Sequence, residues 1–107
     1  MKKSEQLAIN ARVLHFLEAN ADLKKPVVPS SEWKQLRSCS ADYIHIGHYL
    51  VLRSYATVVA VYDMQNDTLY DFLRYVYGYT ATSAQHIAKF ANEFCDRVTT
   101  RLTYKEV

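Results

Sequence analysis

Two cysteines and four histidines are the residues whose types could support metal binding or nucleophilic catalysis. Cys39, His45 and His48 form the first candidate site, because thiolate and imidazole groups are the usual ligands of zinc. Side chains three residues apart point to opposite faces of a regular strand, so His45 and His48 converge only if Gly47 bends the chain. The spacing matches no zinc finger. We therefore favour two polar residues at a hairpin turn and a small buried thiol at Cys39.

His86 and Cys95 are the candidates for a fourth zinc ligand. Either cysteine, with His86 or His48 as base, also has the residue types of a thiol enzyme. No catalytic signature surrounds either cysteine, and Cys95 falls in a predicted packed helix. The aspartates at 63, 67 and 71 lie in or near a predicted turn, where backbone geometry favours aspartate. Two isolated glycines cannot form a phosphate-binding loop. We predict that the protein is not an enzyme and has no catalytic residues.

A cluster of tyrosines is the most unusual feature, since eight of the nine lie between Tyr43 and Tyr79. Tyrosine provides large, stiff contact area, and tyrosine and arginine are enriched in interface hot spots. A small domain cannot bury all eight with their hydroxyl groups hydrogen-bonded, so some must face solvent. The alternative is a half-buried tyrosine face beneath the helices. The candidate partner-binding residues are Tyr49, Arg53, Tyr55, Arg74, Tyr75 and Tyr77.

The same aromatic and arginine side chains could instead stack on the bases of a nucleic acid. Four nearby acidic residues oppose this interpretation, and no RNA-binding signature is present. The formal net charge of +2 is low for a dedicated nucleic-acid binder, for which a pI of about 9 or more is expected. A net charge of +2 also argues against a protein that mimics nucleic acid, because such a mimic would present many carboxylates. Contact with a protein is therefore the favoured interpretation, and a nucleic-acid-binding regulator is the alternative.

The length of 107 residues fits one domain, spanning residues 1–107. Half of the residues are apolar, so the chain can form a core and intrinsic disorder is not expected. The longest apolar run is interrupted at Thr57, short of the roughly 18 to 20 residues that a membrane span needs. No secretory signal follows the basic start, and two cysteines fit a reducing compartment. We predict a cytoplasmic location and no membrane partner.

Apolar residues three and four apart predict a first helix from residue 4 to about residue 21. Ser4 is expected near its N-terminus as a capping residue. The expected apolar face is broad and includes Leu7, Ala11, Leu14 and Leu17, with Ile9, Val13 and Phe16 beside them. Two prolines in residues 22–29 indicate a connector. A short second helix is expected from residue 30 to about residue 38, with Trp33 and Leu36 on one side.

From Tyr43 to Tyr79 the spacing of the apolar residues changes to every second position, which is typical of strands. β-Branched and aromatic residues dominate this segment. Strands are predicted at residues 43–46 and 49–53, on either side of Gly47. Residues 55–62 form a nearly continuous apolar run, which predicts a central strand buried on both faces. Residues 63–67 are the expected turn after this strand.

Residues 68–77 are predicted to return as one or two strands, although residues 69–77 also fit helical spacing. A capping-box pattern at residues 82–85 predicts a helix that extends to residue 98. The tail, residues 99–107, could continue that helix, add an edge strand or fray. The predicted fold class is α+β: an N-terminal helix, a short helix, an antiparallel sheet of three or four strands, and a C-terminal helix packed on the sheet.

Two segments follow a recognisable pattern: Ser54-Tyr55-Ala56-Thr57-Val58-Val59-Ala60-Val61 and Tyr79-Thr80-Ala81-Thr82-Ser83-Ala84-Gln85-His86-Ile87-Ala88-Lys89-Phe90. They resemble a loose group of small, mostly uncharacterised phage and prophage proteins. In that group an S-Y-x-T-x-V/I-A strand is followed by a return strand and a T-T/S-x-x-H-x-x-x-F helix start. The match covers residues 54–90, and Ala81 and Ala84 depart from the more polar pattern.

The resemblance implies a biological setting more than a chemistry. Small phage accessory proteins often bind and disable host machinery, as anti-CRISPR inhibitors do, and others regulate transcription. With a near-neutral charge, the expected function is an inhibitor that occludes a protein surface of a host effector such as a CRISPR nuclease. A homodimer is possible, and a zinc-binding interaction module is the third interpretation. Within the pattern, Thr82 is expected to cap a helix, and His86 to bond a strand carbonyl.

Overall fold

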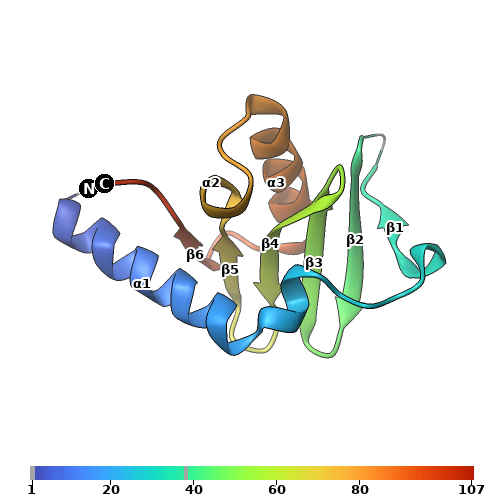
Figure 1. Cartoon of the computed structure of the whole chain (residues 1–107), viewed down its shortest axis with the longest axis horizontal. Coiled ribbons are helices and arrows are strands. Elements are labelled where there is room, and N and C mark those ends of the chain that lie inside the picture. Colours follow the sequence, from blue (N-terminus) through green and yellow to red (C-terminus); the bar gives the residue numbers. More distant parts are fainter. Residues whose placement is uncertain (1, 38) are drawn as a thin grey trace.

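The computed structural model describes residues 2–37 and 39–107, in which a six-stranded sheet lies between two helices, α1 (Lys3–Ala19) and α3 (Ala81–Phe94). Figure 1 shows α1 in front of the sheet and α3 behind it. The predicted α+β class, with an N-terminal and a C-terminal helix, is confirmed. The predicted sheet of three or four antiparallel strands is too small, and the observed sheet is mixed.

The strands follow one another across the sheet in chain order. They are β1 (Lys34–Gln35), β2 (Ala41–Ile46), β3 (Tyr49–Ser54), β4 (Thr57–Asp63), β5 (Thr68–Asp71) and β6 (Thr100–Thr103). The first five strands pair antiparallel with one another, whereas β6 runs parallel to β5. A parallel pair needs a long crossover, and α3 lies within that crossover. The tail therefore adopts one of the three conformations left open, an edge strand.

The turns between the central strands use backbone with positive φ. Gly47 has φ 60° between β2 and β3, Tyr55 has φ 56° between β3 and β4, and Asp67 has φ 48° before β5. This conformation suits glycine and is tolerated by aspartate, but it is unfavourable for tyrosine. The Tyr55 N–H donates to the carbonyl of Ser40 at 2.8 Å, which helps to hold the turn. The predicted central strand accordingly begins at Thr57 and is buried along nearly its whole length, as expected.

Side chains of the sheet pack in two layers because consecutive strand residues point to opposite faces. Val51 of β3 packs toward α1, whereas Leu50 and Leu52 pack toward α3. The α1 layer includes Val13, Phe16, Leu17, Val61, Phe72 and Leu102. The α3 layer includes Leu36, Val59, Leu73, Ile87, Phe90 and Ala91. The sheet thus separates two apolar layers, each closed by one helix.

The N-terminal helix is confirmed, but its cap and its buried face differ from the prediction. Lys2 occupies the N-cap position without a side-chain hydrogen bond, so Ser4 is not the cap. Leu7, expected on the apolar face, is 49% exposed. Of the expected residues, Val13, Phe16 and Leu17 are buried, and the polar residues Gln6 and Asn10 are buried with them. A 3-10 turn, η1 (Ala21–Lys24), follows the helix and buries Leu23.

Hydrogen bonds to the C-terminal segment explain why the buried side of α1 includes two amide side chains. The side chain of Gln6 donates to the carbonyl of Thr103 at 2.9 Å. The Asn10 amide donates to the carbonyl of Lys105 at 2.6 Å and accepts from the Lys105 N–H at 3.0 Å. These bonds attach the C-terminal segment to α1, so the buried polar groups are satisfied.

The predicted short helix at residues 30–38 is wrong. Residues 30–32 form only a 3-10 turn, η2 (Ser30–Glu32), and β1 follows it. Lys34 pairs with Tyr43, and the Leu36 N–H donates to the carbonyl of Ala41 at 2.8 Å. Pairing with β2 therefore satisfies backbone groups that a helix would have satisfied internally. Residue 38, the expected helix end, lies outside the described residues.

Residues 68–77 divide between the two predicted conformations. The segment begins as β5 and continues as a single helical turn, α2 (Leu73–Val76). The Asp71 carboxylate accepts a hydrogen bond from the Leu73 N–H at 3.2 Å, and this contact supports the start of the turn. Phe72, between strand and helix, is fully buried.

The C-terminal helix begins and ends earlier than predicted. Thr80 is the N-cap, and its side chain accepts from the Ser83 N–H at 3.1 Å, so Thr82 does not cap the helix. The helix ends at Phe94 rather than at residue 98, because Cys95 takes extended backbone geometry. In the described ranges, no helix is long and apolar enough to cross a membrane.

Candidate functional site

Four tyrosines have exposed side chains: Tyr55 (50%), Tyr75 (50%), Tyr77 (42%) and Tyr79 (56%). The expectation that some tyrosines face solvent is thus confirmed. Three of the four lie in α2 and in the loop that rises from it to the start of α3 (Figure 1). We define the tyrosine surface as Arg74, Tyr75, Tyr77, Tyr79 and Tyr104.

Side-chain contacts within the tyrosine surface restrain the rings of Tyr75, Tyr79 and Tyr104. The rings of Tyr75 and Tyr104 meet edge to face, with centroids 5.2 Å apart. The guanidinium carbon of Arg74 lies 4.4 Å from the centre of the Tyr79 ring. Side chains that are already ordered lose less conformational entropy when they bind. The surface therefore presents aromatic area that is both exposed and restrained.

The backbone beneath the tyrosine surface is anchored in the core. Phe72 and Leu73 are buried, so α2 is fixed at its first residues. Gly78 has φ 89°, and its N–H donates to the carbonyl of Leu73 at 3.1 Å. A left-handed glycine of this kind ends a helix without steric cost. The turn directs the chain outward between Tyr77 and Tyr79.

An open cleft of about 420 Å³ lies beside Tyr75. Its other walls come from α1 and η1: Leu14, Leu17, Glu18, Ala21 and Lys24. The cleft extends the tyrosine surface onto the N-terminal helix. The combined area offers an aromatic ridge next to a hollow with one acidic and one basic side chain.

A buried hydrogen-bonded cluster lies next to the fourth exposed tyrosine. The Ser54 hydroxyl lies 2.8 Å from the Ser83 hydroxyl and 2.8 Å from Nδ1 of His86. We call these three residues the serine–histidine clasp. It joins the end of β3 to the first turns of α3. His86 thus bonds a strand side chain, not the expected strand carbonyl.

The clasp is a structural contact in this structure. A serine beside a histidine has the residue types of a nucleophile and its base, but both serines are fully buried. Burial, together with the charge of Lys89, holds the pKa of His86 below its ordinary value, so the ring is neutral at pH 7. The Tyr55 ring covers it at a centroid distance of 5.6 Å.

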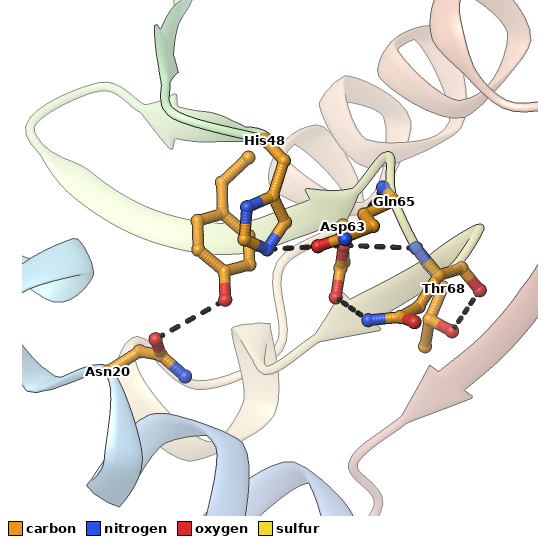
Figure 2. A network of polar contacts seen from close by, with 7 residues as sticks. Asn20, His48, Asp63, Gln65 and Thr68 are labelled. Carbon is orange, nitrogen blue, oxygen red and sulfur yellow. Dashed lines mark hydrogen bonds and ion pairs between the residues drawn. The ribbon is translucent and has the colours of Figure 1, made fainter.

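Tyr49 is not part of the exposed surface, although it was a candidate partner-binding residue. Its ring packs edge-on against Phe16 at 5.8 Å, and its hydroxyl donates to Asn20 at 3.5 Å. Figure 2 shows its partner Asn20 beside the network around Asp63, a buried carboxylate. Burial, and then the charge of Asp63, raise the pKa of Tyr49.

Arg53, another candidate, is also engaged within the molecule. Its guanidinium lies 4.0 Å from the centre of the Trp33 ring and donates to the Asp42 carboxylate at 2.8 Å. Of the six predicted residues, Tyr55, Tyr75 and Tyr77 are exposed and Arg74 is partly buried beside Tyr79. The alternative of a half-buried tyrosine face beneath the helices therefore holds for Tyr49. It does not hold for Tyr75 and Tyr77, which follow β5 and are exposed.

The structure does not bring together the proposed zinc ligands Cys39, His45 and His48. Cys39 precedes β2 and donates to the carbonyl of Leu36 at 2.8 Å, whereas His45 lies near the far end of that strand. Six residues of strand span about 20 Å. The His48 ring instead lies 3.7 Å from the carboxylate of Asp63 (Figure 2). Among residues 2–37 and 39–107, no group of three or more such side chains could hold a metal ion.

Tyr79 and Tyr104 belong to the tyrosine surface but were not among the predicted residues. Tyr79 has the largest exposed fraction of the four exposed tyrosines. Its position between Gly78 and the helix-capping Thr80 was a usable signal, because loop residues next to a helix start face solvent more often than strand residues do. No local signal could have paired Tyr104 with Tyr75, since β6 brings them together.

The chain matches no protein-family model, no curated protein and no solved structure.

Proposed function

We propose that this chain is a protein-binding module that acts by occluding a surface of a partner protein. The observation that carries the proposal is the tyrosine surface: three exposed tyrosines on one short segment, fixed by buried Phe72 and Leu73. Tyrosine and arginine supply most of the large energetic contributions at protein interfaces. A partner that covers these rings would gain apolar contact while their hydroxyl groups stay hydrogen-bonded at the rim.

The charge balance supports a protein partner over a nucleic acid. Recognition of a phosphate backbone requires several cations, and its affinity falls steeply with salt. The tyrosine surface contains Arg74 as its one cation, and this guanidinium is already stacked on Tyr79. The adjoining cleft contains Glu18 as well as Lys24. Binding through this surface is therefore expected to depend mainly on aromatic contact and only weakly on salt.

The resemblance of residues 54–90 to small phage proteins supports a particular setting for this activity. We expect the partner to be a host protein in the bacterial cytoplasm that the phage benefits from inhibiting. A CRISPR effector nuclease is the leading candidate, and the chain would then be an anti-CRISPR inhibitor. It would act without catalysis, in a fixed ratio to its target. A regulator that binds nucleic acid remains the second candidate, because the exposed rings could also stack on bases.

Affinity capture from host lysate, in parallel at low and high salt, tests the proposal. The wild-type chain is compared with a variant in which Tyr75, Tyr77 and Tyr79 are replaced by alanine. The control is Val98→Ala, because this side chain is 82% exposed and lies outside the tyrosine surface. We expect the wild type and the control to retain one host protein at both salt concentrations, and the triple variant to lose it. Retention of nucleic acid alone, and only at low salt, would support the regulator instead.

A further inference from the structure

The two edges of the sheet differ in how their backbone groups are satisfied. Beyond β6, side-chain amides of α1 occupy the backbone groups of Thr103 and Lys105, as described above. At the other edge, β1 has only two residues and pairs with Asp42 and Tyr43 of β2. The remainder of β2, from Ile44 to Ile46, extends beyond β1. The C-terminal end of the β6 edge is therefore protected by α1, and the β2 edge beyond β1 is open.

Successive residues of a strand direct their backbone N–H and C=O groups to alternate sides, and this shows which groups of β2 face the open edge. The Ala41 carbonyl accepts from the N–H of Leu36, directly after β1, so the backbone groups of Ala41, Tyr43 and His45 point to that side of β2. The carbonyl of Ser40 accepts from Tyr55 and points to the other side, as the alternation requires. In the described chain, no segment pairs with β2 beyond Tyr43 on the open side. The N–H and C=O of His45 thus face outward.

An open cleft of about 490 Å³ runs along this part of β2. One wall consists of four consecutive strand residues, Tyr43, Ile44, His45 and Ile46. Neighbouring strand side chains point to opposite faces, so a cleft that touches all four follows the edge of the strand. The opposite wall is formed by Val28, Pro29, Glu32 and Lys34.

The size of the cleft fits a short extended segment. One extended residue occupies on the order of 160 Å³, from about 3.3 Å of rise, about 4.8 Å between strands and about 10 Å of sheet thickness. The cleft therefore has room for about three residues. We propose that it binds an extended peptide segment of a partner protein, which adds to β2 as a strand in line with β1. The central peptide residue exchanges two backbone hydrogen bonds with His45, the mode known as β-augmentation.

The side chains around the cleft define the peptide pattern. The residue opposite His45 points to the same face as His45 and Lys34, both of which are exposed, so a polar residue fits there. The residues on either side of it point to the face of Ile44 and Ile46, beside Val28, and apolar side chains fit there. The preferred segment is apolar–polar–apolar in extended conformation.

A second copy of this chain fits the cleft less well than a single peptide. In a symmetric pair of β2 strands, each copy would bring its own residues 28–34 to the position that the other strand must occupy. The wall of Pro29 and Glu32 leaves space for one strand only. The cleft also lies apart from the tyrosine surface: Figure 1 shows β1 and β2 at the right of the sheet and α2 to the left of β4. The inference therefore does not depend on the proposed function.

Proline at position 45 provides a specific test. His45→Pro removes the outward N–H, and proline is tolerated in an edge strand where that group faces solvent. His45→Ala is the matched control, because it removes the side chain and keeps the N–H. Val28→Trp fills the cleft from the opposite wall and leaves β2 unchanged. A displayed library of random linear peptides is selected against the wild type, and the best peptide is titrated into all four proteins.

We expect selected peptides to share the apolar–polar–apolar pattern and to slow hydrogen exchange of the His45 amide. His45→Pro and Val28→Trp should each weaken binding by about tenfold or more, while His45→Ala binds within about threefold of the wild type. If His45→Pro does not fold, Val28→Trp and the exchange measurement decide the question. Equal binding by all folded variants, no enriched peptide, or a concentration-dependent dimer that His45→Pro abolishes would overturn the proposal.

Discussion

The hydroxyl of Ser54 lies 2.8 Å from Nδ1 of His86, and this contact joins the end of β3 to α3 in the interior of the molecule. Ser83 completes the cluster at 2.8 Å from the same hydroxyl. All three side chains are buried, so each depends on the others for hydrogen bonds. The clasp holds α3 against the strand end at which the chain turns through Tyr55. Its removal should therefore affect stability before it affects any exposed contact.

Ser54→Ala should destabilise the protein by about 1–3 kcal/mol, because Ser83 and His86 each lose a buried partner. Chemical denaturation measures the change. Ser83→Ala removes a second member of the same cluster, so the double variant should cost less than the sum of the two single variants. Additive effects would mean that the three side chains do not act as one cluster.

Acid should destabilise the protein through His86. Its pKa is held below 6.5, chiefly by burial, so the folded state binds fewer protons than the unfolded state as the pH falls. The stability contribution is therefore fully present above about pH 6.5 and decreases below it. The free energy of unfolding, measured at intervals between pH 7.5 and 5, should show this decrease.

His86→Asn is the control for that measurement. It should be less stable at pH 7 but should lose the part of the pH dependence that comes from the imidazole. Burial raises the pKa of Asp71, so its contribution has the opposite sign, but Asp71 is present in both proteins and its contribution cancels in the comparison. An unchanged slope between the wild type and His86→Asn would contradict the assignment to His86.

Asn10→Ala should release the C-terminal segment from α1. The substitution removes the hydrogen bonds to the N–H and the carbonyl of Lys105, at an expected cost of about 1–3 kcal/mol. Hydrogen exchange at the Lys105 amide should become faster. Leu7→Ala, on the exposed side of the same helix, should change stability by less than about 0.5 kcal/mol. The reverse order of effects would support the apolar face expected from the sequence pattern.

Cys95 should react slowly with alkylating reagents in the folded protein. Burial is the main cause that raises its pKa to about 11, and the thiolate is the reactive form. At pH 8 only about one thiol in a thousand would then be ionised. A Cys39→Ser variant isolates the reaction, followed by mass spectrometry with and without denaturant. Equal rates in the two conditions would show that the thiol is not protected.

The elements that local patterns specify were predictable. Gly47 and the alternating residues on either side of it indicate the β2–β3 hairpin, and the apolar run through Val58 and Val61 indicates a buried central strand. The capping of α3 was predicted within two residues, because a run of hydroxyl side chains around Thr80 offers more than one suitable cap. Exposed tyrosines followed from composition and size alone.

The elements that depend on distant residues were not predictable in the same way. β1 has two residues and exists only because it pairs with β2. Gln6 and Asn10 are buried only because the C-terminal segment supplies their partners, about a hundred residues later in the chain. The same limitation applies to the site. Tyr49 is exposed or buried according to how α1 lies on the sheet, which its own neighbours in sequence do not determine.

Titration calorimetry with the purified captured partner tests the central claim most directly. The partner is titrated with the wild type, with Val98→Ala, and with the chain carrying Tyr75→Ala, Tyr77→Ala and Tyr79→Ala, after circular dichroism has shown that all three are folded. The account predicts one-to-one binding whose affinity is little changed by salt, and a loss of about thirtyfold or more in the triple variant alone. Wild-type affinity in a folded triple variant would contradict it.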